Sequence, residues 1–114
     1  MTVLYGIKNC DTVKKARTWL DAHQVAYQFH DFRSDGLDRR DIASWLQILG
    51  AEKLINKRST TWKQLSEQEK ALALTKDAVD LILAHPTLIK RPLLDTGKSL
   101  HSGFKGTDYA QIFA

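Results

Sequence analysis

Residues 2–12 read Thr-Val-Leu-Tyr-Gly-Ile-Lys-Asn-Cys-Asp-Thr, and this stretch decides the fold. Its first half is apolar and rich in residues that favour strands, which predicts a short buried strand followed by a turn. Apolar residues then recur at helical spacing at Val13, Ala16 and Leu20, which predicts an amphipathic helix. Cys10, the one cysteine of the chain, therefore lies where a strand gives way to a helix.

A cysteine at such a junction is a candidate nucleophile. The first backbone N–H groups of a helix have no partners within the helix, and they favour the thiolate over the thiol. The thiolate is the form that attacks a substrate. The alternative is a cysteine that only packs, because free cysteine is among the most buried residue types. Position alone leaves both interpretations of Cys10 open.

The pattern on either side of this junction predicts an α/β fold. Val25, Tyr27 and Phe29 occupy every second position, which predicts a second strand parallel to the first. The apolar run 88–94 and the residues near 99–101 predict two short strands joined by a turn, and a closing helix should follow them. The predicted order is β-α-β, then β-β-α.

Helices are predicted between these two halves. Asp38 is expected to cap a helix that ends at Gly50. Ser66 and Glu69 form the capping-box pattern of a further helical stretch, which should end before Pro86.

The number of helices in this stretch stays open, because Thr75 is a second candidate cap within residues 67–84. A chain of 114 residues is long enough to build one hydrophobic core without disulfide bonds or a bound metal. We therefore expect a single domain over residues 1–114, with a helical insertion over about 38–84.

The charge pattern does not indicate a nucleic-acid-binding protein. Hydrophobic residues make up 43% of the chain and charged residues 26%, as in ordinary globular proteins. The net charge is +4, but lysines and arginines are spread along the chain with acidic residues between them. A nucleic-acid interface would show a denser basic stripe.

The single cysteine also limits the compartment and the metal chemistry. It excludes an internal disulfide and a cysteine-rich metal site, and the four histidines lack metal-ligand spacing, so we expect no bound metal. We find neither a signal peptide nor an apolar run approaching the about 18 residues of a membrane span. These features predict a cytoplasmic protein without membrane contact.

Three segments occur in a fixed order that is specific for one family: residues 5–12, Arg-Ser-Thr-Thr-Trp at 58–62 and Ile-Lys-Arg-Pro-Leu at 89–93. With them the chain resembles the arsenate reductase (ArsC-like) family. Within that family it is most similar to the YffB-type glutathione-dependent thiol reductases, and the Spx regulators are relatives. The resemblance covers essentially the whole chain. It implies a thioredoxin-like fold with a central four-stranded mixed sheet and helices inserted between the halves.

The resemblance also implies a site. Cys10 would be the catalytic nucleophile, and Arg58 and Arg91 would hold an oxyanion beside it, since an arginine fork donates two parallel hydrogen bonds. Pro92 would pack beside the sulfur with a cis peptide bond before it. No cofactor would be bound; glutathione would be the co-substrate and glutaredoxin a partner, acting on an oxidised thiol or an oxyanion.

Two departures from the family pattern bear on function. Arsenate reductases of this type carry a third arginine after the last strand, where this chain has Lys105 in the stretch 100–105, which argues against arsenate as substrate. The Spx regulators commonly use a Cys-x-x-Cys switch, and Val13 replaces its second cysteine here. The alternative interpretation is a Spx-like regulatory protein that binds RNA polymerase or another protein without turnover.

Overall fold

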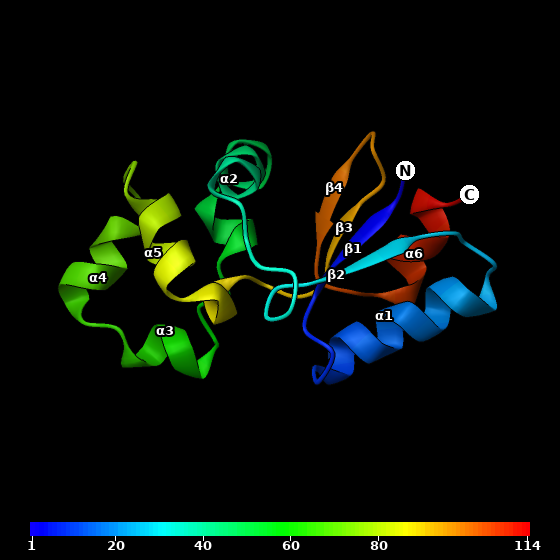
Figure 1. Ribbon diagram of the computed structural model, residues 1–114, viewed down its shortest axis with the longest axis horizontal. Helices are drawn as coiled ribbons and strands as arrows, with labels where there is room; N and C mark the ends of the chain where they lie inside the picture. The colour runs from blue at the N-terminus through cyan, green and yellow to red at the C-terminus, as the bar shows by residue number, and fades with distance from the viewer. The chain divides into compact units, whose positions relative to one another are not determined.

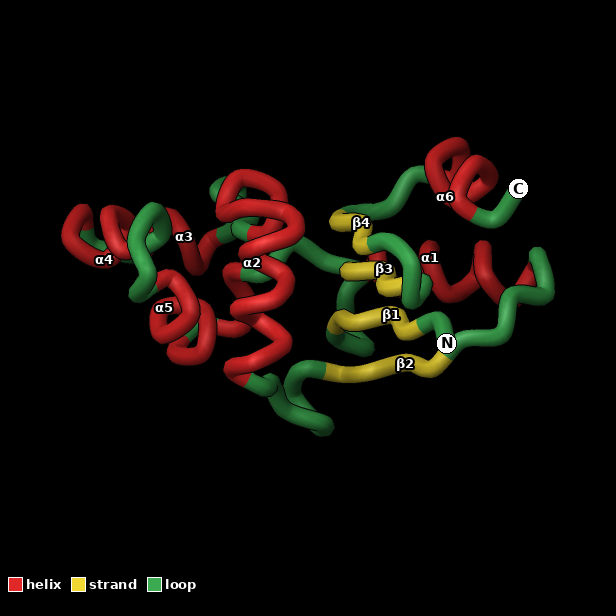
Figure 2. Tube along the Cα trace, turned by 90° about the horizontal axis from the view of Figure 1, so that it is seen from above, coloured by secondary structure: helices red, strands yellow, loops and turns green.

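In the computed structural model, which describes residues 1–114, the chain forms two compact units (Figure 1). The first comprises Met1–Gly36 and Arg91–Ala114 and holds the strands, and we call it the sheet unit. The second comprises Leu37–Lys90 and contains helices only, and we call it the helical unit. In Figure 2, which is coloured by secondary structure, the yellow strands all belong to the sheet unit, and helices, in red, occur in both units.

The sheet unit contains the predicted four-stranded mixed sheet in the order β2-β1-β3-β4. β1 pairs with β2 in parallel and with β3 antiparallel, and β3 pairs with β4 antiparallel. The predicted order β-α-β followed by β-β-α is therefore confirmed. The elements are β1 (Val3–Gly6), α1 (Asp11–Ala22), β2 (Gln28–Asp31), β3 (Leu93–Asp95), β4 (Leu100–Ser102) and α6 (Gly106–Ile112).

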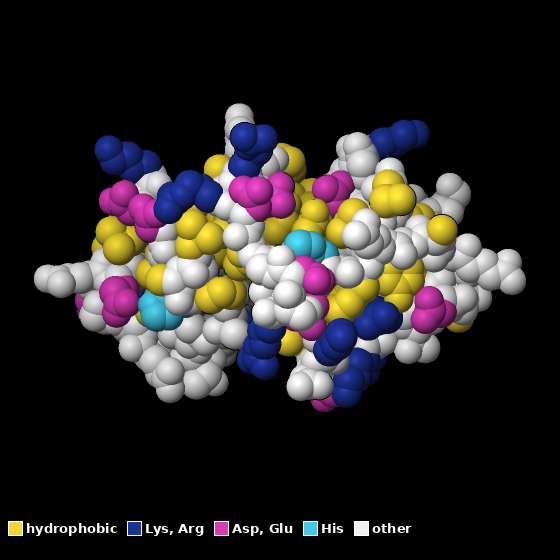
Figure 3. Space-filling model, in the orientation of Figure 1, with side chains coloured by type: hydrophobic (Ala, Val, Ile, Leu, Met, Phe, Trp, Pro, Cys, Tyr) yellow, Lys and Arg dark blue, Asp and Glu magenta, His cyan; other side chains and the backbone are white.

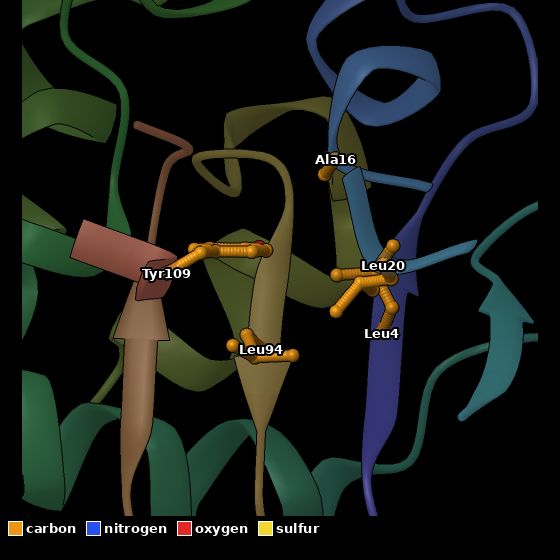
Figure 4. Packing of buried hydrophobic residues seen from close by; sticks show 5 residues of the cluster. All are labelled: Leu4, Ala16, Leu20, Leu94 and Tyr109. Carbon is orange, nitrogen blue, oxygen red and sulfur yellow. The ribbon is translucent and has the colours of Figure 1, made fainter. Parts of the chain in front are cut away.

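The core of the sheet unit joins α1 and α6 to the central strands (Figure 4). Leu4 and Leu94 are register partners in β1 and β3, so their side chains share one face of the sheet. Ala16 and Leu20 from α1 and Tyr109 from α6 complete the cluster, and none of the five is more than 1% exposed. Burial of a large apolar side chain contributes about 1.5–3 kcal/mol, so this cluster fixes α1 to β1.

The second strand begins later than the alternation predicted. Gln28 pairs with Val3, the first residue of β1, and its N–H donates to the carbonyl of Thr2 at 2.9 Å. Since β1 begins at Val3, the residues before Gln28 have no partner in β1. Val25 and Tyr27 instead pack, partly buried, against the core cluster, which explains their apolar character without a strand.

The helical unit consists of short helices, and none of the chain's helices is long and apolar enough to span a membrane. The part of the chain predicted as an insertion over about 38–84 falls in this unit. Its elements are α2 (Arg39–Leu54), α3 (Thr60–Gln64), α4 (Glu67–Leu72), α5 (Ala78–Ala84) and the 3-10 turn η1 (Pro86–Leu88).

The first helix of this unit confirms the predictions made for both of its ends. Asp38 caps α2, and its carboxylate accepts from the N–H of Arg40 at 2.8 Å. The predicted stop at Gly50 is also confirmed, because its φ of 76° and ψ of 165° are not helical and separate two helical stretches within Arg39–Leu54. A glycine adopts this conformation at little steric cost. The second stretch, which follows Gly50 and ends at Leu54, was not predicted.

The later helices settle the question that the sequence left open. Ser66 and Glu69 form the predicted capping box, with N–H···O distances of 3.1 and 3.0 Å. Two helices follow rather than one, and Thr75 is not the cap of the second. Asp77 is at that position, and its N–H donates to the Thr75 hydroxyl at 3.1 Å. α5 ends before Pro86, as predicted.

Candidate active site

The strand register brings three chain segments to one edge of the sheet. Gly6, the last residue of β1, pairs with Asp31, the last residue of β2. β3 runs in the opposite direction and begins at Leu93, beside the same end of β1, so Pro92 enters the sheet at this edge. The loop that leads to Cys10 leaves from it.

Cys10 is the N-cap residue of α1, as the sequence predicted. Its backbone is extended, with φ −100° and ψ 123°, and its side chain makes no capping hydrogen bond. Its N–H donates to the carbonyl of Ile7 at 3.2 Å, and its carbonyl accepts from the N–H of Lys14 at 3.0 Å. The free, half-buried thiol thus lies at the end of a 12-residue helix where N–H groups favour an anion.

A close contact holds the start of α1 against β1. A Cβ atom on Gly6 would lie 2.7 Å from Cγ2 of Val13, a fully buried side chain in the first turn of α1. A side chain at this position would force Val13 or its surroundings to shift, because Val13 is stiff and fully buried. Gly6 therefore helps to fix the place of Cys10.

Asp31 is a residue of this edge that the sequence analysis did not identify. Its side chain is only 4% exposed, and its carboxylate accepts three backbone N–H groups. Oδ2 accepts from Lys8 at 3.1 Å, and Oδ1 accepts from Arg33 at 2.7 Å and Ser34 at 3.4 Å. An aspartate before a polar turn is a known signal for the two local bonds. Nothing local predicts the bond to Lys8, which lies 23 residues away.

These contacts determine the ionisation of Asp31. Burial alone would raise the pKa of the carboxyl group, because it disfavours the charged form. The N–H groups of Arg33, Lys8 and Ser34, together with the charge of Lys8, outweigh burial and hold the pKa below its usual value. Asp31 is therefore a carboxylate at neutral pH.

Arg91 and Pro92 lie at the same sheet edge. The Arg91–Pro92 peptide bond is cis, which confirms the expectation from the resemblance. Pro92 is buried, and its carbonyl accepts from the N–H of Gly103 at 2.9 Å. Arg91 is half-buried directly before β3. The sheet unit thus carries three of the four predicted site residues.

Arg58 lies in the helical unit. It is exposed in the turn before α3, where its N–H donates to Oδ1 of Asn56 at 3.0 Å and the following residue, Ser59, caps the helix. Its action together with Cys10 stays a prediction. Lys105, at the position of the missing arginine, is exposed and is the N-cap residue of α6 in the sheet unit.

The remaining polar side chains do not form a second site of a familiar kind. No three His, Cys, Asp or Glu side chains are arranged to hold a metal ion. On the face shown in Figure 3, lysine and arginine side chains are spread out with acidic side chains among them. Cys10 and its surroundings are therefore the candidate active site.

Comparisons with known proteins agree with this geometry. A solved structure of a protein named YFFB matches with a TM-score of 0.94 and 46% identity, over 100% of both chains. An arsenate reductase (ArsC) related protein from Brucella melitensis matches with a TM-score of 0.78 and 40% identity, over 98% of this chain and 93% of that one. The global transcriptional regulator Spx of Streptococcus pyogenes is 32% identical over 91% of this chain and 78% of its own length.

The family assignment rests on nearly the whole length of the chain. The model of the ArsC family matches residues 5–112, which include the Cys10 loop and both arginine segments. The mixed sheet and the match to ArsC-like structures identify the fold as thioredoxin-like. The chain therefore belongs to the ArsC family.

Proposed function

We propose that this protein is a thiol-dependent oxidoreductase in which Cys10 is the nucleophile. The observation that carries the proposal is the free thiol at the start of α1, which makes no capping bond. The position of Arg91, half-buried directly before β3 at the same sheet edge, supports it. Relatives described as arsenate reductase related, with 40% identity in one case, support an oxidoreductase rather than another thiol chemistry.

The proposed reaction is an exchange of disulfides. The Cys10 thiolate attacks the glutathione sulfur of a mixed disulfide; a new S–S bond forms, the old one breaks, and the released thiolate takes a proton from water. A second glutathione then attacks the adduct, which gives oxidised glutathione and restores the Cys10 thiolate. The two electrons come from glutathione. Because the chain has one cysteine, the second thiol has to come from another molecule, glutathione or a glutaredoxin.

Arginine is suited to the charge in this reaction. We propose that Arg91, assisted by Arg58, stabilises the thiolate and binds the anionic groups of the substrate. Lys105 brings a positive charge but not the planar fork of an arginine. We therefore propose that a thiol compound, rather than arsenate, is the preferred substrate.

The proposal is tested by mass spectrometry after incubation with oxidised glutathione. The wild-type protein should gain one glutathione, and Cys10→Ser should gain none, because no other sulfur nucleophile is present. Turnover should then be measured with glutathione and glutaredoxin against mixed disulfides and arsenate. A wild-type protein that forms no adduct and reduces none of these substrates would rule out the reductase function.

A second candidate function follows from the similarity to Spx, a transcriptional regulator, over 91% of the chain. Under this alternative the protein binds RNA polymerase without turnover. Retention of polymerase from a bacterial extract should then be equal for the wild type and Cys10→Ser. The lack of a second cysteine at Val13 counts against a disulfide switch of the Cys-x-x-Cys kind.

A further inference from the structure

Asp31 is the only charged side chain in the buried core of the protein. A buried carboxylate is costly unless hydrogen bonds compensate it. Two of its three N–H partners, Arg33 and Ser34, belong to its own turn and would serve a merely local role. The third, Lys8, belongs to the loop between β1 and Cys10. Its bond to Asp31 therefore links this loop to the end of β2.

The turn around Asp31 is itself well fixed. The N–H of Asp31 donates to Oδ2 of Asp35 at 2.9 Å, and the N–H of Asp35 donates back to the carbonyl of Asp31 at 2.8 Å. The N–H of the next residue, Phe32, donates to the carbonyl of Gly6 at 2.9 Å. The Asp31 carboxylate is therefore carried by a turn whose backbone is held by three hydrogen bonds.

The loop before Cys10 is bonded to this carboxylate through the N–H of Lys8. Lys8 and Asn9 are exposed and lie outside the strand and the helix. The loop is closed by the bond from the N–H of Cys10 to the carbonyl of Ile7, the residue directly before Lys8. Holding Lys8 thus orients the peptide groups that lead into the N-cap.

We propose that Asp31 is a positioning residue for Cys10, which fixes the nucleophile through the backbone N–H of Lys8. The inference rests on the proposed function, since it assigns Asp31 to the disulfide exchange at Cys10. The lowered pKa of Asp31 agrees with it, because the acceptor is charged at neutral pH.

The first test is Asp31→Asn, which keeps the size of the side chain but replaces an acceptor oxygen with an NH2 group. The rate constant for Cys10 with oxidised glutathione should fall by about 10- to 100-fold, as expected when a reacting group is misplaced. Electrostatics alone predicts the opposite, because loss of a negative charge favours a thiolate. The amide proton of Lys8 should shift in a 1H–15N spectrum and lose protection from exchange.

Asp95→Asn is the matched control. Asp95 also accepts a backbone N–H, from Gly97 at 2.8 Å, but it is the last residue of β3, at the opposite end of the sheet. Its variant should react with oxidised glutathione at the wild-type rate. Iodoacetamide, a small electrophile with little need for orientation, should alkylate all three proteins at rates that differ far less than those with oxidised glutathione.

A second variant covers the case in which Asp31→Asn does not fold. A synthetic segment 1–9 with an ester in place of the Ile7–Lys8 amide can be ligated at Cys10, which removes the Lys8 N–H donor and also weakens the Ile7 carbonyl as the acceptor for the N–H of Cys10. Its reaction with oxidised glutathione should be slowed as for Asp31→Asn. A folded Asp31→Asn or an ester variant that reacts at the wild-type rate or faster would overturn the inference while leaving the proposed function intact. A wild-type protein without any adduct would overturn both.

Discussion

Because Asp31 is charged and buried, its contribution to the stability of the protein should depend on pH. Its folded-state pKa lies below the unfolded value of about 3.9, so its contribution to stability is complete above that pH and is lost as the pH falls through the folded-state pKa. Urea unfolding of the wild type and Asp31→Asn should show the largest difference at pH 7 and a smaller one near pH 3. A difference that is the same at both pH values would contradict this assignment.

Cys10 and Asp31 show how far single residues can be predicted. The signals for Cys10 are local: an apolar strand before it, a helical pattern after it and no second cysteine in the chain. The importance of Asp31 depends on Lys8, a backbone partner 23 residues away, and no sequence pattern encodes that pairing. Residues that bind through the backbone of another element are missed for this reason.

At the level of elements, the contact between β1 and α1 makes Gly6 sensitive to substitution. Gly6→Ala would place a methyl group 2.7 Å from a methyl group of Val13, a stiff and fully buried side chain. Overpacking of this kind costs about 1–3 kcal/mol, which denaturant unfolding would detect. Val13→Ala in the same chain should recover part of the loss that Gly6→Ala causes.

Gly106→Ala provides the comparison for this prediction. A Cβ on Gly106 would meet Trp19 at 3.7 Å, an ordinary contact, at the first position of α6. This variant should be as stable as the wild type or more stable, since alanine reduces the freedom of the unfolded chain. Equal losses for the two glycine variants would show that the close contact at Gly6 is not the cause.

The bounds of a helix or strand can be predicted where the signal lies within a few residues of the bound. They are predicted less well where a residue of another element sets the bound. The capping box at Ser66 and the cap at Asp38 were found because each lies within a few residues of what it binds. The start of β2 was misplaced because it is set by Val3, across the sheet. The stop at Gly50 is a local signal as well, whereas no local signal predicts the short helical stretch that follows it up to Leu54.

At the level of the whole molecule, the roles proposed for Arg91 and Arg58 can be tested one residue at a time. Arg91→Ala in the sheet unit should lower the rate with oxidised glutathione by about 10-fold or more, as expected for loss of a charged hydrogen bond worth about 1.5–3 kcal/mol. The neutral bis(2-hydroxyethyl) disulfide should be affected much less, because it offers no carboxylate. The ratio of the two rates therefore separates anion binding from damage to the thiol.

Arg58→Ala should change this ratio in the same direction if Arg58 assists Arg91 as proposed. Lys63→Ala is the control, because Lys63 is an equally exposed cation a few residues further along, in α3. It should leave the ratio unchanged, because a lysine lacks the planar fork with which an arginine binds a carboxylate. A ratio that changes with Arg91→Ala but not with Arg58→Ala would confine the anion site to the sheet unit. Equal changes for Arg58→Ala and Lys63→Ala would instead attribute the effect to net charge, and the arginine fork would then have no special part in substrate binding.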